Sequence, residues 1–263
     1  MNLPGNVIRK LARAGYTSRG VVYLIIGVLA CFAAVGAAET TNTKGALQHL
    51  LSQPFGHALL GALVAGLFGY VVWRLVQAIF DADDHGHSLK ALTIRAGLLA
   101  SAFTYATLAV YALSRMGVFS GGSSGGGGGV AQTLSGFIGS RTVAIGMAAI
   151  FVGVGGAHCW KAVTMKFEDH LQAGEETMRI LRPISVIGLL ARGIVFFILA
   201  FLLFYRGLSA GDGGGGPPDI EDALRFMQEL PMGWLILTVM GAGIVLFAVY
   251  SFCEAYWRRV NVA

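Results

Sequence analysis

Two arginines that stand directly before uncharged apolar runs are the residues of this sequence best placed to do chemistry. Arg19 and Arg192 each complete the pattern Gly-x-x-x-Arg-Gly, in "GYTSRG" and "GLLARG". A charge at the edge of a membrane span pairs with another group, faces a polar cavity or extends to the lipid headgroups. The pattern therefore predicts either headgroup anchors or members of a basic site for an anion.

Such a basic site would be built from positions that match one another along three successive segments and lie at a similar depth. The candidate residues are Arg19, Arg192, Lys161, Ser101, Gln77 and Glu254. Within this set, Glu254 would face Arg192 and Gln77 would face Arg19. The ligand would be an anionic lipid or a small anion. Because Ser101 stands where a third arginine is expected, the headgroup-anchor interpretation is favoured for Arg19.

Other site chemistry is weakly supported. The loop 81–87, "DADDHGH", could ligate a divalent cation, but it has no second supporting set of ligands, so no metal site is predicted. His158 has no second histidine at its depth, since His57 belongs to the opposite face, which disfavours haem. No carboxylate lies at mid-membrane, and no nucleophile–base set stands on one side. We therefore predict no cofactor and no enzymatic activity.

The composition requires a membrane. Only 13% of the 263 residues are charged and 55% are apolar, whereas soluble domains are about 25% charged. Apolar stretches long enough to cross about 30 Å of hydrocarbon recur along the chain. The six predicted spans are 17–37, 55–79, 94–115, 141–162, 184–206 and 232–256. These stretches predict an all-α protein with a single membrane domain, 1–263.

The distribution of basic residues predicts the orientation. With the six spans alternating in direction, fourteen of the 19 Lys and Arg residues fall on the side of the N-terminus and five on the opposite side. Cytoplasmic loops carry such an excess, so both termini are expected in the cytoplasm of a bacterial inner membrane. The net charge of +5 then reflects topology and indicates no nucleic-acid partner. A cleaved signal peptide at the N-terminus is the less favoured alternative.

An internal repeat organises the chain. The segments 14–30, 96–112 and 187–203 align without gaps, so that Gly15, Gly97 and Gly188 are equivalent. The second span of each unit repeats more loosely, with Pro54 over Pro231. Each repeat holds two spans, so the three have the same orientation. We predict six transmembrane helices as three parallel two-helix repeats, 11–85, 93–170 and 184–260, in a pseudo-three-fold arrangement.

Small residues and glycine-rich segments complete the predicted organisation. Small residues seven positions apart mark a face on which helices approach closely; they are Gly20, Gly27, Ala109, Gly193 and Ala200. The segments 118–130 and 209–218 are predicted external linkers. The segments "GALQHLLSQPFG" and "DIEDALRFMQELPMG" are predicted short helices at the outer interface.

The segments "GYTSRGVVYLIIG", "GLLARGIVFFILA" and "LLSQPFGHALLGALVAGLFGYVVWRLVQA" resemble the bacterial membrane family catalogued as domain of unknown function 1206. The resemblance implies three repeats of a two-helix unit over nearly the whole chain. It carries over no catalytic or binding residue. The second repeat departs from the pattern, with Ser101 and Ala102 in place of Arg and Gly.

The expected role is a non-enzymatic scaffold or accessory subunit that contacts membrane lipids, another membrane protein or a second copy of itself. Abundant small-residue packing and few polar groups in the spans support this expectation. The alternative is a transporter or channel for a small solute or ion along the pseudo-three-fold axis. Such a path would be lined by Ser101, Thr104 and Tyr105, with Arg19 and Arg192 at its mouth.

Overall fold

The computed structural model describes residues 5–36, 43–82, 86, 88–118, 140–208 and 220–259. Within these residues the chain is helical and holds no strand, apart from one isolated bridge between Leu171 and Arg258. The helices are α1 (Gly5–Ala34), α2 (Thr43–Leu51), α3 (Gly56–Phe80), α4 (Leu89–Arg115), α6 (Ser140–Val163), the 3-10 turn η1 (Glu168–His170), α7 (Glu175–Leu208), α8 (Ile220–Glu229) and α9 (Gly233–Trp257). The predicted all-α class is confirmed.

Six of these helices, α1, α3, α4, α6, α7 and α9, are long and apolar enough to cross a membrane. They coincide with the six predicted spans, so the chain is a multi-pass membrane protein whose helices contact lipid. The predicted linkers 118–130 and 209–218 lie outside the described residues, except for Val118. Most of the 81–87 loop is also outside them, although the Asp81 carboxylate accepts a hydrogen bond from the Gly86 amide at 2.7 Å.

The short helices α2 and α8 lead into α3 and α9 through equivalent turns. Phe55 and Met232 both adopt left-handed backbone conformations, with φ of 61° and 58°. The glycines that follow, Gly56 and Gly233, approach backbone carbonyls of the preceding short helix so closely that a Cβ would collide with them. Glycine at these positions therefore lets each short helix fold back against the span that follows it.

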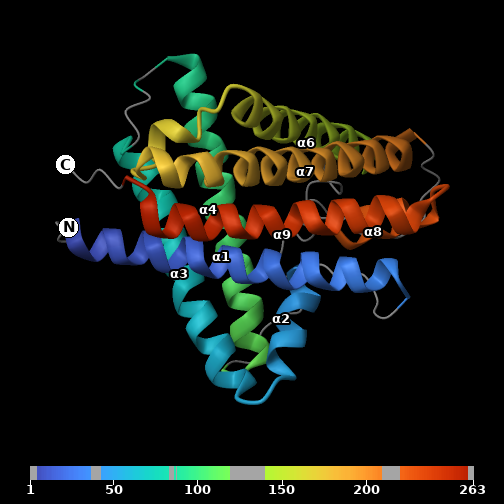
Figure 1. The fold of residues 1–263 in the computed structure, drawn as a ribbon, viewed down its shortest axis with the longest axis horizontal. Coiled ribbons are helices and arrows are strands. Elements are labelled where there is room, and N and C mark those ends of the chain that lie inside the picture. Colours follow the sequence, from blue (N-terminus) through green and yellow to red (C-terminus); the bar gives the residue numbers. More distant parts are fainter. Residues whose placement is uncertain are drawn as a thin grey trace.

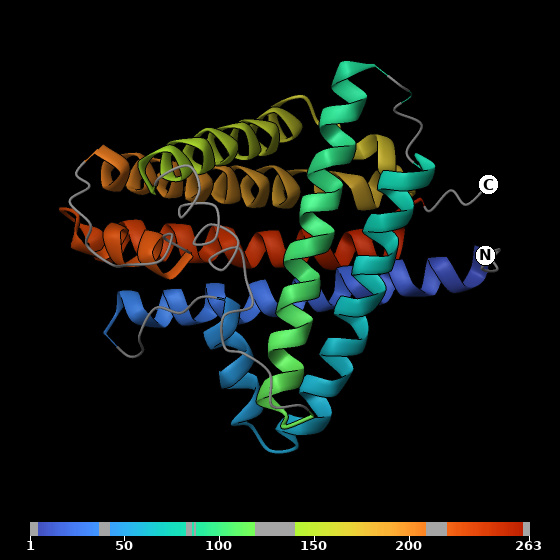
Figure 2. The same cartoon turned by 180° about the vertical axis from the view of Figure 1, so that it is seen from behind.

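The long helices form a series rather than a closed ring. α1 lies beside α9, α9 beside α7 and α7 beside α6 (Figure 1). On its other side α1 packs against α3, and α3 packs against α4. The α3–α4 pair runs across the other four helices instead of alongside them (Figure 2). α4 and α6, the two spans of the middle repeat, form no packed interface within the described residues. The pseudo-three-fold arrangement is therefore not confirmed, and transport along its axis stays a prediction.

The first and third repeats make equivalent internal contacts. A Cβ on Gly15 of α1 would collide with Tyr70 of α3, and a Cβ on Gly188 of α7 would lie 2.5 Å from the Phe247 amide nitrogen of α9. The close approaches of Gly66 to Ser18 and of Gly243 to Ala191 repeat this correspondence. The two spans thus meet at the same points in both repeats.

Small residues also join one repeat to another. A Cβ on Gly27 of α1 would lie 2.8 Å from the Val245 amide nitrogen of α9. Gly20 faces Phe252 of α9, and Gly193 of α7 faces Cys159 of α6. Ala109 and Ala200, the alanines aligned with Gly27, are buried. Glycine at these points permits the close backbone approach on which helix association in lipid depends.

Candidate functional site

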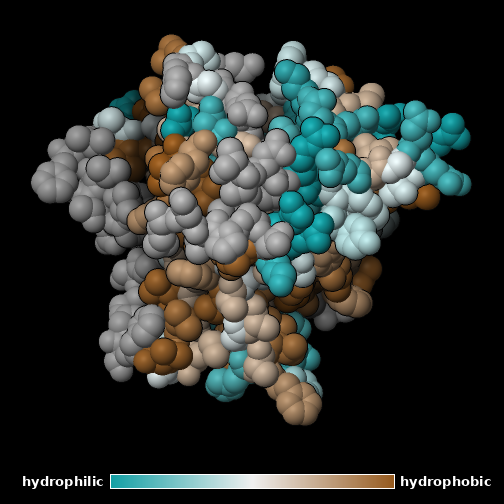
Figure 3. Space-filling view, turned by 90° about the vertical axis from the view of Figure 1, so that its left-hand side faces the viewer, coloured by the Kyte–Doolittle hydropathy of each residue, from teal (hydrophilic) through white to brown (hydrophobic). Residues whose placement is uncertain are grey.

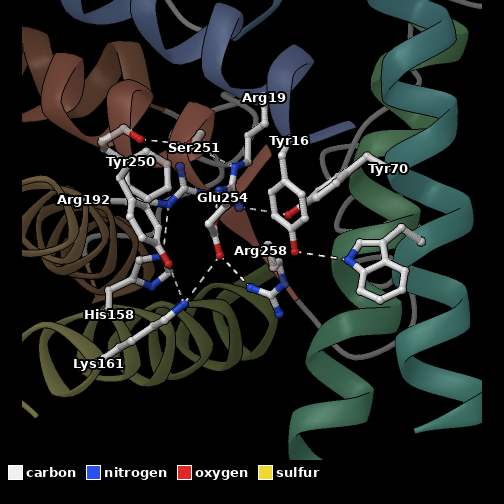
Figure 4. A network of polar contacts seen from close by, with 12 residues as sticks. Tyr16, Arg19, Tyr70, His158, Lys161, Arg192, Tyr250, Ser251, Glu254 and Arg258 are labelled. Carbon is white, nitrogen blue, oxygen red and sulfur yellow. Dashed lines mark hydrogen bonds and ion pairs between the residues drawn. The ribbon is translucent and has the colours of Figure 1, made fainter. Parts of the chain in front are cut away.

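A buried carboxylate, Glu254, contacts cations from two other helices and from the residue that caps its own helix. It lies near the end of α9 and is 3% exposed. Arg19 of α1 forms an ion pair with Oε2, Arg258 Nη1 donates to Oε1 at 2.6 Å, and Lys161 Nζ of α6 lies 3.8 Å from Oε1. We name the residues around this centre the Glu254 cluster (Figure 4); its members are Tyr16, Arg19, Tyr70, Arg74, His158, Lys161, Arg192, Tyr250, Ser251, Glu254 and Arg258.

Arg19 uses every nitrogen of its guanidinium within the protein. Nε donates to Ser251 Oγ at 3.1 Å, Nη1 donates to Tyr70 Oη at 3.0 Å, and Nη2 donates to Glu254. The residue is only 6% exposed. The favoured prediction, that Arg19 extends to the headgroups as an anchor, is therefore wrong: its partners lie inside the protein, on α3 and α9.

Tyrosines extend the cluster to α3. Tyr70 Oη accepts hydrogen bonds from both Arg19 and Arg74, and Arg74 Nη1 donates to Gln77 Oε1 at 3.0 Å. The Tyr16 ring lies between two guanidinium carbons, 5.0 Å from that of Arg19 and 5.3 Å from that of Arg258. Aromatic faces attract cations, so these rings help the helices to hold several positive charges close together.

Arg192 takes a different partner from the predicted one. Its Nε donates to His158 Nε2 at 3.1 Å, while Glu254 pairs with Arg19, Lys161 and Arg258. The predicted pairing of Arg192 with Glu254 is therefore wrong. The Arg192 guanidinium carbon also lies 4.5 Å from the centroid of Phe247, a ring that Arg19 contacts from 5.3 Å. Both arginines of the repeated motif thus meet at one ring.

The hydrogen bonds of His158 fix its tautomer. Nδ1 lies 2.9 Å from the Val154 carbonyl oxygen, which can only accept, so Nδ1 carries the proton. Nε2 then accepts from Arg192. With both ring nitrogens engaged, His158 is a neutral link between α6 and α7. The described residues contain no group of three or more His, Cys, Asp or Glu residues that could hold a metal ion.

The structure brings together most of the predicted site residues. Arg19, Lys161 and Glu254 meet directly; Gln77 is 1% exposed and joins through Arg74. Arg192 joins through Phe247 and His158. Ser101 lies on α4, and no hydrogen bond links it to the cluster among the described residues. Its neighbour Tyr105 packs against Tyr70, with ring centroids 4.7 Å apart.

Five cluster residues are not predicted from the sequence: Tyr16, Tyr70, Tyr250, Ser251 and Arg258. Tyrosine and serine in apolar spans give no charge signal. Arg258 stands just beyond a predicted span, where a basic residue is ordinary. Its spacing from Glu254, four residues on a helix, was the available signal, because side chains at that spacing lie on one face.

The excess of positive charge is the main chemical feature of the cluster. Five cations, Arg19, Arg74, Lys161, Arg192 and Arg258, accompany the single carboxylate of Glu254 in the cluster. Lys161 keeps 30% of its side chain exposed and donates to Tyr250 Oη at 2.8 Å. Arg192 Nη1 is buried and has no hydrogen-bond partner in the described part of the chain. The cluster therefore carries more positive than negative charge among the described residues.

The loop between α6 and α7 closes against the end of α9. The Gln172 amide donates to the Trp257 carbonyl at 2.8 Å, and the Arg259 amide donates to the His170 carbonyl at 2.9 Å. Nearby, Arg182 donates two hydrogen bonds to the Glu168 carboxylate, at 2.6 and 3.0 Å. These hydrogen bonds hold the pKa of Glu168 below its usual value.

The Glu168–Arg182 pair predicts a modest dependence of stability on pH. Since the pKa of Glu168 is lower in the folded state, the pair stabilises the protein fully above the ordinary glutamate pKa of about 4.3. That contribution is lost as the pH falls through the lowered value. Thermal unfolding from neutral pH to about pH 3 should therefore show a smaller loss in Glu168→Gln than in the wild type. Glu229→Gln, an exposed change on α8, should follow the wild type; an unchanged profile in Glu168→Gln would contradict the prediction.

The fold and the cluster together define an α-helical multi-pass membrane protein with a cation-rich ionic centre shared by five of its spans and by Arg258. The family model described as Domain of Unknown Function (DUF1206) matches residues 14–81 and 187–258, more than half of the chain. The chain belongs to this family. The matched regions lie within the first and third repeats and include Arg19, Arg192 and Glu254.

A relative can be aligned with this sequence over nearly its full length. The chain is 29% identical over 265 residues to a Bacillus subtilis (strain 168) protein described as "Uncharacterized protein YxxB". The match covers 97% of this chain and 92% of that protein. No solved structure matches the chain.

Proposed function

We propose that this protein is a non-enzymatic scaffold of the bacterial inner membrane that binds an anionic phosphate headgroup at the Glu254 cluster. The observation that carries the proposal is the imbalance of five cations against one carboxylate. Several buried cations near one another repel unless an anion lies close to them. A phosphate group has the charge and the acceptor oxygens to satisfy them.

Two side chains are positioned to receive the headgroup. Lys161 is the most exposed cation that contacts Glu254, and Arg192 Nη1 lacks a partner among the described residues. Both belong to the packed α6–α7 pair. His158, one turn before Lys161 on α6, already binds Arg192. A phosphate between Lys161 and Arg192 would therefore complete a site whose geometry α6 and α7 fix.

The proposed orientation places this site at the cytoplasmic leaflet. Both termini belong to the end of the molecule that carries the cluster (Figure 1). Figure 3 shows hydrophilic side chains gathered over part of that end, beside apolar surface. The excess of basic residues on the same side supports cytoplasmic termini. Anionic lipids of that leaflet attract such basic sites.

The scaffold role follows from how the polar groups are used. Glu254 is held by cations of the protein itself, and His158 serves as a neutral hydrogen-bond link. Such groups tie helices together; none of them is poised as a nucleophile with an adjacent base. A scaffold of this kind would contact lipid through its apolar helix faces and would present its loops to a partner protein or a second copy.

Native mass spectrometry of protein extracted from membranes tests the headgroup site. We expect Lys161→Gln/Arg192→Gln to lose most of the anionic phospholipid that the wild type retains, because the substitutions remove the partly exposed ammonium of Lys161 and the unpartnered Nη1 of Arg192. The control is Arg115→Gln/Arg141→Gln, which removes two exposed charges at the opposite ends of α4 and α6. Retention equal to that of the control would contradict the proposal. Adding phosphatidylglycerol or inorganic phosphate separately distinguishes a lipid from a free anion.

A further inference from the structure

The two spans of the middle repeat expose matching faces. On α4, Gly97 and Ala100 are exposed, and on α6, Ile150 and Gly153 are exposed. A Cβ added to Gly97 or to Gly153 would meet no atom within 4 Å. Exposed small residues alone identify no interface, but the repeats provide an independent guide to what these faces contact.

The first repeat shows how such faces pack. Positions of α1 and α4 correspond at a shift of 82, as Gly15 and Gly97 do, and positions of α3 and α6 correspond at a shift of 84, as Gln77 and Lys161 do. In the first repeat Gly15 approaches Tyr70 and Ser18 approaches Gly66. The equivalent contacts in the middle repeat would join Gly97 to Val154, and Ala100 to Ile150.

The third repeat makes the same contacts as the first. There Gly188 approaches Phe247, and Ala191 approaches Gly243. In the repeat alignment, the equivalents of these pairs in the middle repeat are again Gly97 with Val154 and Ala100 with Ile150. Two of the three repeats therefore pack their spans through the same positions, and only the middle one leaves them open.

The contacts between one repeat and another are also equivalent. Gly20 of α1 faces Phe252 of α9, and Gly193 of α7 faces Cys159 of α6, at equivalent positions. α4 packs against α3, so the first span of each repeat contacts the second span of another repeat. Around a six-helix ring, every neighbouring pair of spans therefore packs within the described structure except α4 with α6.

The bilayer supplies a reason for the last pair to pack. Six spans that cross the same hydrocarbon layer must run in a roughly common direction. The α3–α4 pair instead runs across the other four helices (Figures 1 and 2). A swing of α3 and α4 about the contacts of Gly15 and Gly66 would align them with the rest. Small residues then favour close packing of α4 on α6.

We infer that, in the membrane, the Gly97–Ala100 face of α4 docks on the Ile150–Val154 face of α6 of the same chain and closes a six-helix ring. The occupant is the chain's own α6 because both established repeats pack their spans within one hairpin. The inference does not depend on the headgroup site, since none of these four positions belongs to the Glu254 cluster.

Disulfide cross-linking in lipid vesicles tests the inference. The three native cysteines, Cys31, Cys159 and Cys253, are first replaced by alanine. Ala100→Cys/Ile150→Cys then places two thiols on the proposed interface, within the short Cβ separation that a disulfide requires. The control Leu99→Cys/Ile150→Cys keeps the α6 cysteine and moves the α4 cysteine by one residue, about 100° around the helix. Mild oxidation should cross-link the first pair within one chain and leave the control at background.

The other outcomes overturn the inference. A cross-link between two differently tagged copies would show that a second chain occupies this face. Equal cross-linking of the test and control pairs, or none in either, would show that α4 and α6 do not dock in the stated register. Adding Gly97→Leu to the test pair should abolish the cross-link, because a large side chain would fill the space that Val154 is inferred to contact.

Discussion

Glu254→Gln should cost this protein about 3–5 kcal/mol of stability, the usual effect of breaking a buried ion pair from one side. The neutral amide would leave Arg19 and Arg258 buried without the carboxylate that both contact. Arg19 could not relax into lipid, because its other donors are held by Tyr70 and Ser251. α1 and α9 would therefore lose the strongest polar link between the first and third repeats.

Reversible unfolding in mixed lipid–detergent micelles measures this loss. The matched control is Glu229→Gln, the same change at an exposed position of α8, which should alter the free energy of unfolding by less than about 0.5 kcal/mol. The double variant Arg19→Met/Glu254→Gln should recover part of the stability, since it also removes a buried charge that Glu254→Gln alone deprives of its carboxylate. A Glu254→Gln variant as stable as the control would show that the carboxylate does not hold the cluster together.

The fold was largely predictable because the spans are set by hydrophobicity alone. Each long apolar run had to become a helix, since a lipid-exposed backbone needs internal hydrogen bonds. Self-similarity between 14–30 and 187–203 identified Gly15 and Gly188 as equivalent, and the structure gives them equivalent partners in Tyr70 and Phe247. What hydrophobicity could not show is the direction in which α3 and α4 run, because apolar faces suit either lipid or another helix.

The partner of Arg19 was missed for a different reason. Pairing each arginine within its own repeat predicts that Glu254 faces Arg192. In the structure, the first span of one repeat also packs on the second span of another, and this places Arg19 opposite Glu254. The repeat pattern was compatible with both pairings. The choice depends on helix packing, which Gly20 and Gly27 direct towards α9.

That packing makes Gly188→Ala and Gly188→Leu the most informative changes outside the cluster. In an unhindered helix, replacing glycine by alanine stabilises by about 0.5–1 kcal/mol. At Gly188, however, the new Cβ would lie 2.5 Å from the Phe247 amide nitrogen and 2.7 Å from its Cα, where only movement of the backbone can make room. We therefore expect Gly188→Ala to destabilise by about 1–3 kcal/mol and Gly188→Leu by more.

Gly146→Ala is the matched control, because a Cβ at that position of α6 would meet no atom within 4 Å. It should be neutral or slightly stabilising, so the two alanine variants are expected to change the free energy of unfolding in opposite directions. The same unfolding measurement, made on both proteins in lipid–detergent micelles, decides the sign. Destabilisation of Gly188→Ala but not of Gly146→Ala would show that α7 and α9 of the third repeat pack closely at Gly188. Equal stability of the two variants would mean that these helices lie farther apart in lipid, and the equivalence between the first and third repeats would then lose its structural basis.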